Sequence, residues 1–315
     1  QLTVNQRPLN ATLSRQYDGT TTSAGSDLSS FDALQGGETL TLSGSGTSAS
    51  ANVANGIAMS SNGNLALVDG TGLASNYSLN STVINITERV LNSSGSKIYD
   101  ANTDALAADI TLSNLVSGEA LNHSGTATIS SANAGSYTIT NLAGITIADG
   151  SGGTASNYTL TGGTHNFTVN PKVVSIQGNK TYDGNTTISS GDITSITDTV
   201  GAETLVISSG SGTVSSANAA TYASAGINEG TLTLGNGTNG GLASNYTLTG
   251  HAASSFQVAQ RVLSSSGSRI YDGSTTASSS DLTLSNLVGS ETLTLSGNGT
   301  PVSYTHLTLP TNPEV

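Results

Sequence analysis

Residues 242–250 read Leu-Ala-Ser-Asn-Tyr-Thr-Leu-Thr-Gly, and the central part of this stretch occurs three times in the chain. Each Ala-Ser-Asn-Tyr copy ends at a tyrosine: Tyr77, Tyr158 and Tyr246. After Tyr246, threonine alternates with leucine, and a period of two is typical of a half-buried β-strand. A motif that returns at a regular interval is the mark of a repeat protein. The sequence therefore predicts a chain of repeated β units.

Two further motifs recur in the same order. Tyr-Asp occurs four times, at spacings of 82, 83 and 89 residues: Tyr17-Asp18, Tyr99-Asp100, Tyr182-Asp183 and Tyr271-Asp272. The third residue is glycine in every copy but one, where it is Ala101. About twenty residues later comes a glutamate, followed by Thr or Ala and then by Leu: Glu38, Glu119, Glu203 and Glu291.

All eight basic residues occupy only two positions of the unit. The first position holds Arg7, Arg89, Lys172 and Arg261. The second, eight residues later, holds Arg15, Lys97, Lys180 and Arg269. Random scatter would not produce this pattern. It predicts repeat 1 over residues 1–84, repeat 2 over 85–167, repeat 3 over 168–256 and a truncated repeat 4 over 257–300.

Composition and period together predict the fold class. Only 9% of the residues are charged, there is no Cys or Trp, and Gly, Ser, Thr and Asn dominate the polar positions. This composition suits short strands and tight turns rather than helices. A period near 80 residues is too long for a β-helix rung and close to an immunoglobulin-like sandwich. We expect an all-β protein of tandem Ig-like antiparallel β-sandwich repeats, about 80–90 residues each, in an elongated array.

Dipeptides of turn type lie between the expected strands: Asp69-Gly70, Asp149-Gly150 and Asn236-Gly237. We expect their glycines to supply the positive φ angles of tight turns.

The charge balance excludes two classes of partner. The net charge is −12 with only eight basic residues, so no basic patch for nucleic acid or anionic membrane can be assembled. No stretch approaches the roughly 20 apolar residues of a membrane span. Residues 1–20 carry no secretory signal, so a secreted protein is expected to have its N-terminus upstream of Gln1.

The Tyr-Asp-Gly motif, the Gly-x-Glu-Thr-Leu turn and the segment 242–250 resemble the bacterial YDG-type repeat domain. That family is similar to the Ig-like modules of very long secreted proteins, including filamentous-haemagglutinin-like exoproteins and other surface adhesins. The resemblance implies a stalk or adhesion module of a large bacterial protein, secreted or on the cell surface, with no catalysis. Its partners would be neighbouring repeats of the same chain and a host-surface glycan or protein.

The last fifteen residues, 301–315, depart from the repeat pattern. They resemble translated sequencing-adapter read-through, so we expect a non-native or disordered tail and a natural chain that continues with further repeats.

No catalytic or cofactor-binding residue is expected. The four histidines share no repeat position, and no activated polar constellation stands out from the structural repeat. Calcium is the one cofactor considered, with candidate ligands in the four Tyr-Asp motifs: Asp18, Asp100, Asp183 and Asp272. The simpler interpretation is a turn in which the aspartate caps its own backbone, the tyrosine packs on the core and the glycine eases the turn. Ala101 indicates that positive φ is not required there, because alanine resists it.

The paired basic positions invite a second hypothesis, a self-forming Lys–Asn isopeptide bond. Arg15 and Arg269 exclude it for their own units, because a guanidinium cannot act as the amine nucleophile. We therefore expect an architectural role. The expected acidic partners are the Glu38 series or a second recurrent series: Asp27, Asp109, Asp192 and Asp281.

A carbohydrate-binding or, less plausibly, ice-binding module is the alternative function. It rests on threonine rows such as Thr39-x-Thr41. One threonine pair per unit is sparse for an ice face, and sugar sites usually present exposed aromatic platforms, yet there is no Trp.

Overall fold

The structure is a computed structural model and describes residues 1–300. It is all β, as the sequence predicts: the helical segments in the described part are 3₁₀ turns of three residues each. None of the described helices is long and apolar enough to span a membrane. The proposed tail, 301–315, lies outside the described residues.

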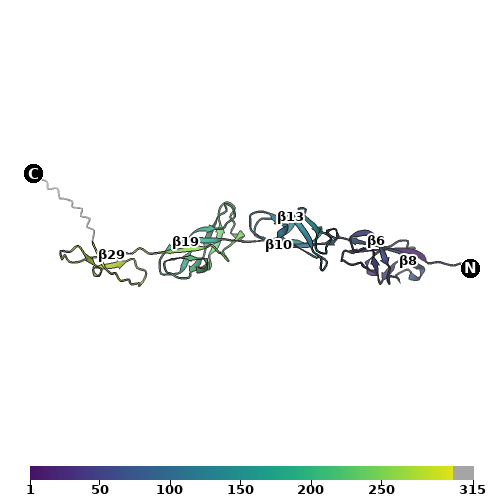
Figure 1. Ribbon diagram of the computed structural model, residues 1–315, viewed down its shortest axis with the longest axis horizontal. Helices are drawn as coiled ribbons and strands as arrows, with labels where there is room; N and C mark the ends of the chain where they lie inside the picture. The colour runs from purple at the N-terminus through teal and green to yellow at the C-terminus, as the bar shows by residue number, and fades with distance from the viewer. Residues whose placement is uncertain (301–315) are drawn as a thin grey trace. The chain divides into compact units, whose positions relative to one another are not determined.

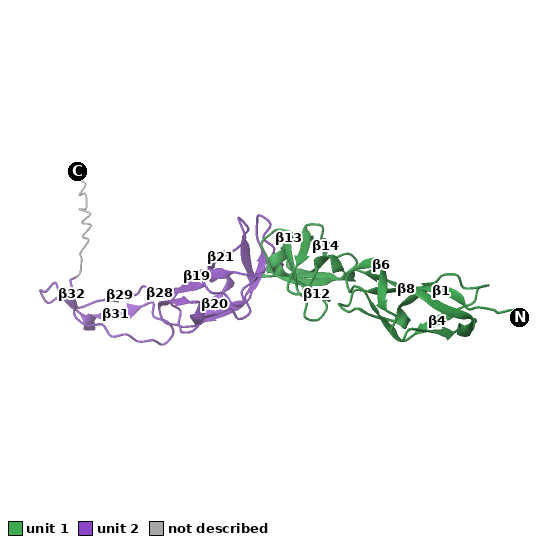
Figure 2. Ribbon diagram, turned by 45° about the vertical axis from the view of Figure 1, so that its right-hand side comes forward, with its two compact units in different colours: residues 1–171 green, residues 172–315 purple. Residues whose placement is uncertain are grey.

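The chain divides into two compact units, coloured separately in Figure 2. The first unit runs from Gln1 to Pro171 and holds repeats 1 and 2, and the second begins at Lys172. Each unit is described by itself.

Repeat 1 has the element order β1 (Arg7–Gln16), β2 (Thr22–Ala24), η1 (Gly25–Asp27), β3 (Leu28–Phe31), β4 (Leu40–Ser43), β5 (Ser45–Ser48), β6 (Ala54–Ser61), β7 (Ala66–Asp69), η2 (Ala74–Asn76) and β8 (Tyr77–Thr87). Repeat 2 follows with β9 (Arg89–Val90), β10 (Asn92–Ile98), β11 (Asp104–Leu106), η3 (Ala107–Asp109), β12 (Ile110–Ser113), β13 (Leu121–Ile129), β14 (Gly135–Asn141), β15 (Ile145–Asp149), η4 (Ala155–Asn157), β16 (Tyr158–Thr159) and β17 (His165–Asn170).

In the second unit, repeat 3 consists of β18 (Lys172–Val173), β19 (Ser175–Thr181), β20 (Thr187–Ser189), η5 (Ser190–Asp192), β21 (Ile193–Thr197), β22 (Leu205–Ser209), β23 (Ser211–Val214), β24 (Ala220–Ala223), η6 (Ser224–Gly226), β25 (Ile227–Asn228), β26 (Thr233–Asn236), η7 (Ala243–Asn245), β27 (Tyr246–Thr247) and β28 (Ser255–Ala259). The described part of repeat 4 has β29 (Ser264–Gly267), β30 (Ala277–Ser278), η8 (Ser279–Asp281), β31 (Leu282–Ser285) and β32 (Asn298–Gly299). Figure 1 labels representative strands of each repeat.

One sheet has the same strand order in all three fuller repeats: β3-β1-β8-β6, β12-β10-β17-β14 and β21-β19-β28-β24. Most pairs are antiparallel, as expected, but the first and last long strands of each repeat are parallel: β1 with β8, β10 with β17 and β19 with β28. The expectation of purely antiparallel sheets needs this correction. Because parallel neighbours point the same way, the chain enters a repeat at one end and leaves it at the other.

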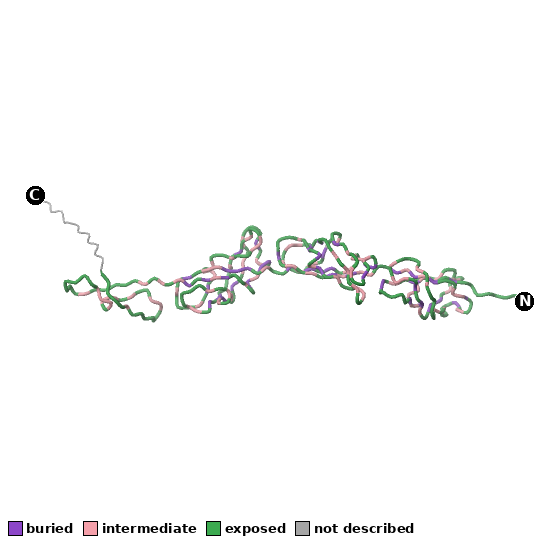
Figure 3. The backbone as a smooth tube through the Cα atoms, in the orientation of Figure 1, coloured by how far each residue is buried: buried purple, intermediate pink, exposed green. Residues whose placement is uncertain are grey.

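The core sits on one face of these central strands. In β1, Leu9, Ala11 and Leu13 alternate with more exposed residues and are at most 1% exposed. Figure 3 shows the buried stretches within repeats 1 to 3. From residue 259 to residue 300, by contrast, no residue is buried.

In each repeat, facing residues on the parallel first and last strands divide the same core volume between them. Leu13 faces Ile84 in repeat 1, whereas Gly95 faces Phe167 in repeat 2. A Cβ added at Gly95 would lie 2.8 Å from the Phe167 ring and 2.4 Å from the Asp109 carbonyl oxygen. Repeat 3 repeats the exchange, with Gly178 opposite Phe256. A large side chain on the last strand thus goes with a glycine on the first, as close packing requires.

The turn glycines serve a different purpose from the expected one. Gly70 does not have positive φ, and neither do Gly150 and Gly237. A Cβ at Gly70 would instead lie 2.3 Å from the carbonyl oxygen of Thr39 on the neighbouring segment. The preceding Asp69 accepts a hydrogen bond from the Ala74 backbone N–H at 2.7 Å and so caps η2. These dipeptides therefore allow close backbone approach and cap a 3₁₀ turn.

Candidate functional site

A tight turn positions each recurrent glutamate. In repeat 2 the Glu119 backbone N–H donates to the Val116 carbonyl at 3.0 Å. The same closure occurs at Glu38, Glu203 and Glu291. Small residues fill the middle of each turn, for example Ser117-Gly118, where Gly118 has φ +86°. The sequence thereby directs one carboxylate toward the end of each repeat.

The tyrosine of Ala-Ser-Asn-Tyr binds this turn from within the same repeat. The hydroxyl of Tyr158 donates to Glu119 Oε2 at 2.7 Å and accepts the Val116 N–H at 3.0 Å. Tyr246 makes the same pair of contacts with Glu203 and Val200. In repeat 1 the Tyr77 hydroxyl donates to Glu38 and accepts the Gln35 N–H. The recurrent glutamate and this tyrosine therefore form one polar pair per repeat.

The tyrosine of Tyr-Asp-Gly binds the glutamate of the next repeat. The Tyr17 hydroxyl donates to Glu119 Oε1 at 2.6 Å, although the two residues are 102 positions apart. In the second unit, Tyr182 donates to Glu291 in the same way. Glu119 thus accepts two phenols, one from its own repeat and one from the repeat before it.

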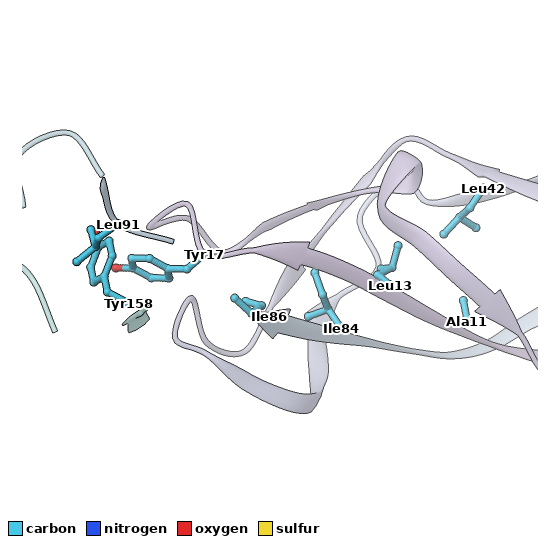
Figure 4. Packing of buried hydrophobic residues seen from close by; sticks show 8 residues of the cluster. All are labelled: Ala11, Leu13, Tyr17, Leu42, Ile84, Ile86, Leu91 and Tyr158. Carbon is cyan, nitrogen blue, oxygen red and sulfur yellow. The ribbon is translucent and has the colours of Figure 1, made fainter. Parts of the chain in front are cut away.

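Apolar packing surrounds this junction. The Tyr17 and Tyr158 rings meet edge to face, with centroids 5.4 Å apart and planes at 78°. Both rings are about 5% exposed or less and belong to one cluster with Leu91, as Figure 4 shows. A Cβ on Gly19 would lie 2.8 Å from Val116 Cγ1, so the glycine admits the next repeat. The hydroxyl hydrogen bonds are therefore partly buried, which makes them stronger than the same bonds in water.

Asn157 adds a second joint between repeats 1 and 2. Its Oδ1 accepts the Val53 backbone N–H at 2.9 Å, and its Nδ2 donates to Asn52 Oδ1 at 3.0 Å. Asn157 is 1% exposed, whereas the equivalent Asn76 in repeat 1 is exposed. Asn157 thus contacts the preceding repeat, a role that sequence analysis missed.

The aspartate of Tyr-Asp-Gly caps its own turn, in agreement with the simpler interpretation. Asp18 Oδ1 accepts the Thr20 backbone N–H at 2.9 Å. The expectation about Ala101 was wrong: its φ is +64°, close to the +78° of Gly19. The turn needs the left-handed conformation in both, and the surrounding hydrogen bonds hold alanine in it at some cost in strain.

The second cation of each repeat pairs with this aspartate three residues later. The four ion pairs are Arg15–Asp18, Lys97–Asp100, Lys180–Asp183 and Arg269–Asp272. This differs from the expected partners in the Glu38 and Asp27 series. Asp27 instead accepts the Ala24 backbone N–H and closes η1. A separation of three residues across the strand end brings the charges together locally, which a search for distant partners overlooks.

Lysine and arginine use different neighbours at this position. Lys97 Nζ donates to Asp100 Oδ1, Asn102 Oδ1 and the carbonyls of Asn102 and Asp104, all at 2.7–2.9 Å. Where the second cation is arginine, the position of Asn102 is taken by Thr20 in repeat 1 and by Ser274 in repeat 4. The guanidinium donates to the backbone carbonyl of that residue. Asparagine therefore accompanies lysine because the compact ammonium needs an extra acceptor.

The first cation binds a backbone carbonyl rather than an acid. Arg89 donates to the Asn114 carbonyl at 2.6 Å and to its Oδ1 at 2.8 Å, and Asn114 has φ +68°. Arg261 makes the same two bonds with Asn286, and Arg7 donates to the backbone carbonyl of Ala33. Lys172 lies half-buried in β18.

The junction shifts the pKa values of its tyrosines. Burial, followed by the hydrogen bond to Glu119, raises the pKa of Tyr17 to about 12. The pKa of Tyr182 is raised, first by its hydrogen bond to Glu291. For Asp18, burial opposes ionisation, but the bonds from Thr20 and Arg15 outweigh it and lower the pKa.

The other two Tyr-Asp tyrosines and the histidines take no part in the junctions described above, and His251 Nε2 lies 3.3 Å from Glu229 Oε2 within repeat 3. Tyr99 is 5% exposed and Tyr271 is 92% exposed. His123 and His165 bond to backbone carbonyls, and His306 lies outside the described residues. Within residues 1–300, no group of three or more His, Asp or Glu side chains is placed to hold a metal ion. Among the recurrent residues, the glutamate and the Tyr-Asp tyrosine join repeat 1 to repeat 2 and repeat 3 to repeat 4. The second cation and the aspartate hold a turn within their own repeat.

These features define a tandem all-β repeat protein in which a tyrosine of repeat 1 contacts repeat 2 and the equivalent tyrosine of repeat 3 contacts repeat 4. The YDG domain family matches residues 2–84 and 87–166, two copies in tandem. The chain belongs to the YDG domain family, as its motifs indicate. No curated protein and no solved structure matches it.

Proposed function

We propose that the chain is a structural module, a stalk or adhesion array, of a large bacterial protein that is secreted or displayed on the cell surface. The observation that carries the proposal is Glu119, which accepts the hydroxyls of Tyr17 and Tyr158 from two repeats. A recurrent residue whose carboxylate is used by neighbouring repeats serves assembly of the array. We assign it no catalytic role and no cofactor.

Two other features support a load-bearing role. Repeats 1 and 2 are joined by Glu88 alone, between β8 and β9. The parallel first and last strands let the chain enter and leave each repeat at opposite ends. Tension along the chain then shears neighbouring strands, which requires many hydrogen bonds to break together.

Single-molecule stretching tests the proposal. The whole chain is held by its ends, and each intact repeat of about 80 residues should release about 28 nm of chain in a separate event. A chain that extends smoothly at low force, with no such events, would contradict a load-bearing role.

A glycan array and intact host cells test the adhesive part. A module that is itself adhesive should be retained on the cells or the array, whereas a module that serves only as a stalk should be retained by neither. Saturable retention that is lost in a Thr39→Ala/Thr41→Ala variant would replace the stalk proposal with the carbohydrate-binding alternative.

A further inference from the structure

Two phenols meet one carboxylate at the junction of repeats 1 and 2. The Tyr17 hydroxyl donates to Glu119 Oε1 at 2.6 Å, and the Tyr158 hydroxyl donates to Glu119 Oε2 at 2.7 Å. Because both oxygens belong to one carboxylate, the hydroxyl-bearing ends of the two rings converge. Figure 4 shows the hydroxyl of Tyr17 directed toward the Tyr158 ring. The carbon atoms that flank the two hydroxyls are therefore brought toward each other.

The rings are also in direct contact. Their centroids lie 5.4 Å apart with the planes at 78°, which is van der Waals contact for an edge-to-face pair. Tyr17 is 5% exposed and Tyr158 is 3% exposed, and Leu91 packs in the same cluster. Close packing limits how far either ring can turn away from the other. The folded chain thus holds the two phenols as a pair.

Glu119 is placed to take a phenolic proton. A phenol that loses one electron becomes a strong acid, and its proton then passes along an existing hydrogen bond to a base. Burial is the main cause that raises the pKa of Tyr17 to about 12, so this phenol keeps its proton at neutral pH until it is oxidised. Glu119 bonds each phenol through a separate oxygen. Either tyrosine can therefore be oxidised in place to a neutral phenoxyl radical.

We propose that Tyr17 and Tyr158 form an oxidative cross-linking site, at which an external one-electron oxidant joins repeats 1 and 2 through a dityrosine bond. Two equivalents of the oxidant each take one electron, one from each phenol, and the two phenolic protons leave through Glu119 to water. The two radicals combine to form one carbon–carbon bond between ring positions next to the hydroxyls. The hydrogens on these two carbons then move to the phenolic oxygens and regenerate both phenols. The product has lost two protons and two electrons, and the oxidant has gained the two electrons.

The place of this bond gives it a consequence for the array. Tyr17 follows β1 of repeat 1, and Tyr158 begins β16 of repeat 2. A bond between them closes a covalent loop of the intervening chain and restricts the unfolded state, as a disulfide does. The cross-linked junction cannot open while the bond is intact.

Photo-oxidation of the full chain with a ruthenium tris-bipyridyl complex and persulfate tests the proposal. This oxidant takes electrons singly and over a short distance through protein, so burial does not protect the pair. At low protein concentration, peptide mapping by mass spectrometry should find a linked pair of peptides joined at Tyr17 and Tyr158. Its mass should be two hydrogen atoms below the sum of the two peptides. Tyr137 and Tyr222 are more exposed than either junction ring, and their products report the reactivity that exposure alone gives.

Variants of the protein supply matched controls. Tyr17→Phe and Tyr158→Phe keep an aromatic ring in place, and each should abolish this product. Glu119→Gln removes the proton acceptor and should lower the yield severalfold in chain that circular dichroism shows to be folded. Glu38→Gln changes the equivalent carboxylate of repeat 1, which binds the Tyr77 hydroxyl, and should leave the yield unchanged. Chain unfolded in urea should lose the preference for the Tyr17–Tyr158 pair.

Three results would overturn the inference. One is a folded chain in which Tyr137 and Tyr222 are oxidised but no Tyr17–Tyr158 product forms. Another is an equal yield of that product from folded and urea-unfolded chain, because the folded geometry would then play no part. The third is a yield that Glu119→Gln leaves unchanged, because the carboxylate would then not be the proton acceptor.

Discussion

Glu119 differs from Glu38 in one respect: it accepts two tyrosine hydroxyls instead of one. A glutamine at this position keeps the shape but loses one acceptor oxygen and the charge. We expect Glu119→Gln to lower the free energy of unfolding of residues 1–171 by about 1–3 kcal/mol, the range for hydrogen bonds to charged groups. Glu38→Gln should cost less. Urea denaturation followed by tyrosine fluorescence measures both, and equal costs would contradict a shared carboxylate.

Tyr17 makes the junction sensitive to alkaline pH. Its pKa is raised from 10.0 to about 12, so the folded state retains the phenolic proton longer than the unfolded state does. The stabilisation is therefore complete below pH 10 and is lost as the pH rises toward about 12. A pH series of urea denaturations should show this decline, and Tyr17→Phe should reduce its slope. If Tyr17→Phe leaves the slope unchanged, the loss of stability at high pH comes from another group.

Lys97 illustrates how a cation and its neighbour are matched. Its side chain is 8% exposed and its ammonium has four oxygen acceptors. Lys97→Met should lower the melting temperature of residues 1–171 by several degrees, because four oxygen acceptors lose their shared donor. Lys97→Arg should also destabilise, and Asn102→Thr should restore part of the loss, since repeat 1 pairs Arg15 with Thr20. Additive effects in the double variant would argue against this matching.

Packing between the first and last strands is the corresponding feature at the scale of elements. Gly95 lies against both Phe167 and the Asp109 carbonyl, with no room for a methyl group. Gly95→Ala should cost about 1–3 kcal/mol through overpacking. The control is Gly191→Ala, where the nearest atom is 3.9 Å away and the change should stay within about 0.5 kcal/mol. Thermal denaturation compares the two, and similar costs would show that the Phe167 contact is not restrictive.

The fold class could be predicted because alternation and composition act locally, within a strand such as residues 246–250. The sequence could not predict whether neighbouring strands pair in parallel or antiparallel, because both arrangements have a period of two. The tyrosine and glutamate positions of the junction were visible as recurrent residues. Their pairing was not, because Tyr17 bonds a glutamate of the next repeat, 102 residues away, and the repeat pattern does not say which copy is used.

At the scale of the molecule, repeats 1 and 2 each bury part of their surface only against the other. Tyr17 is 5% exposed because repeat 2 covers it, and Asn157 is buried against repeat 1. Stability in such an array is the sum of intrinsic terms for the repeats and a term for each junction. A repeat of about 80 residues has a small core, so the junction term is a large share of the total.

The last prediction follows from this coupling. Residues 1–87, repeat 1 alone, should unfold at a lower urea concentration than residues 1–171, because the junction term is missing. Tyr17→Ala should cost several kcal/mol in residues 1–171, the scale for a buried aromatic residue. In residues 1–87 it should cost much less, because the ring no longer has Tyr158 and Leu91 to pack against. The difference between the two costs measures the junction directly, and equal costs would mean that Tyr17 belongs to the core of its own repeat.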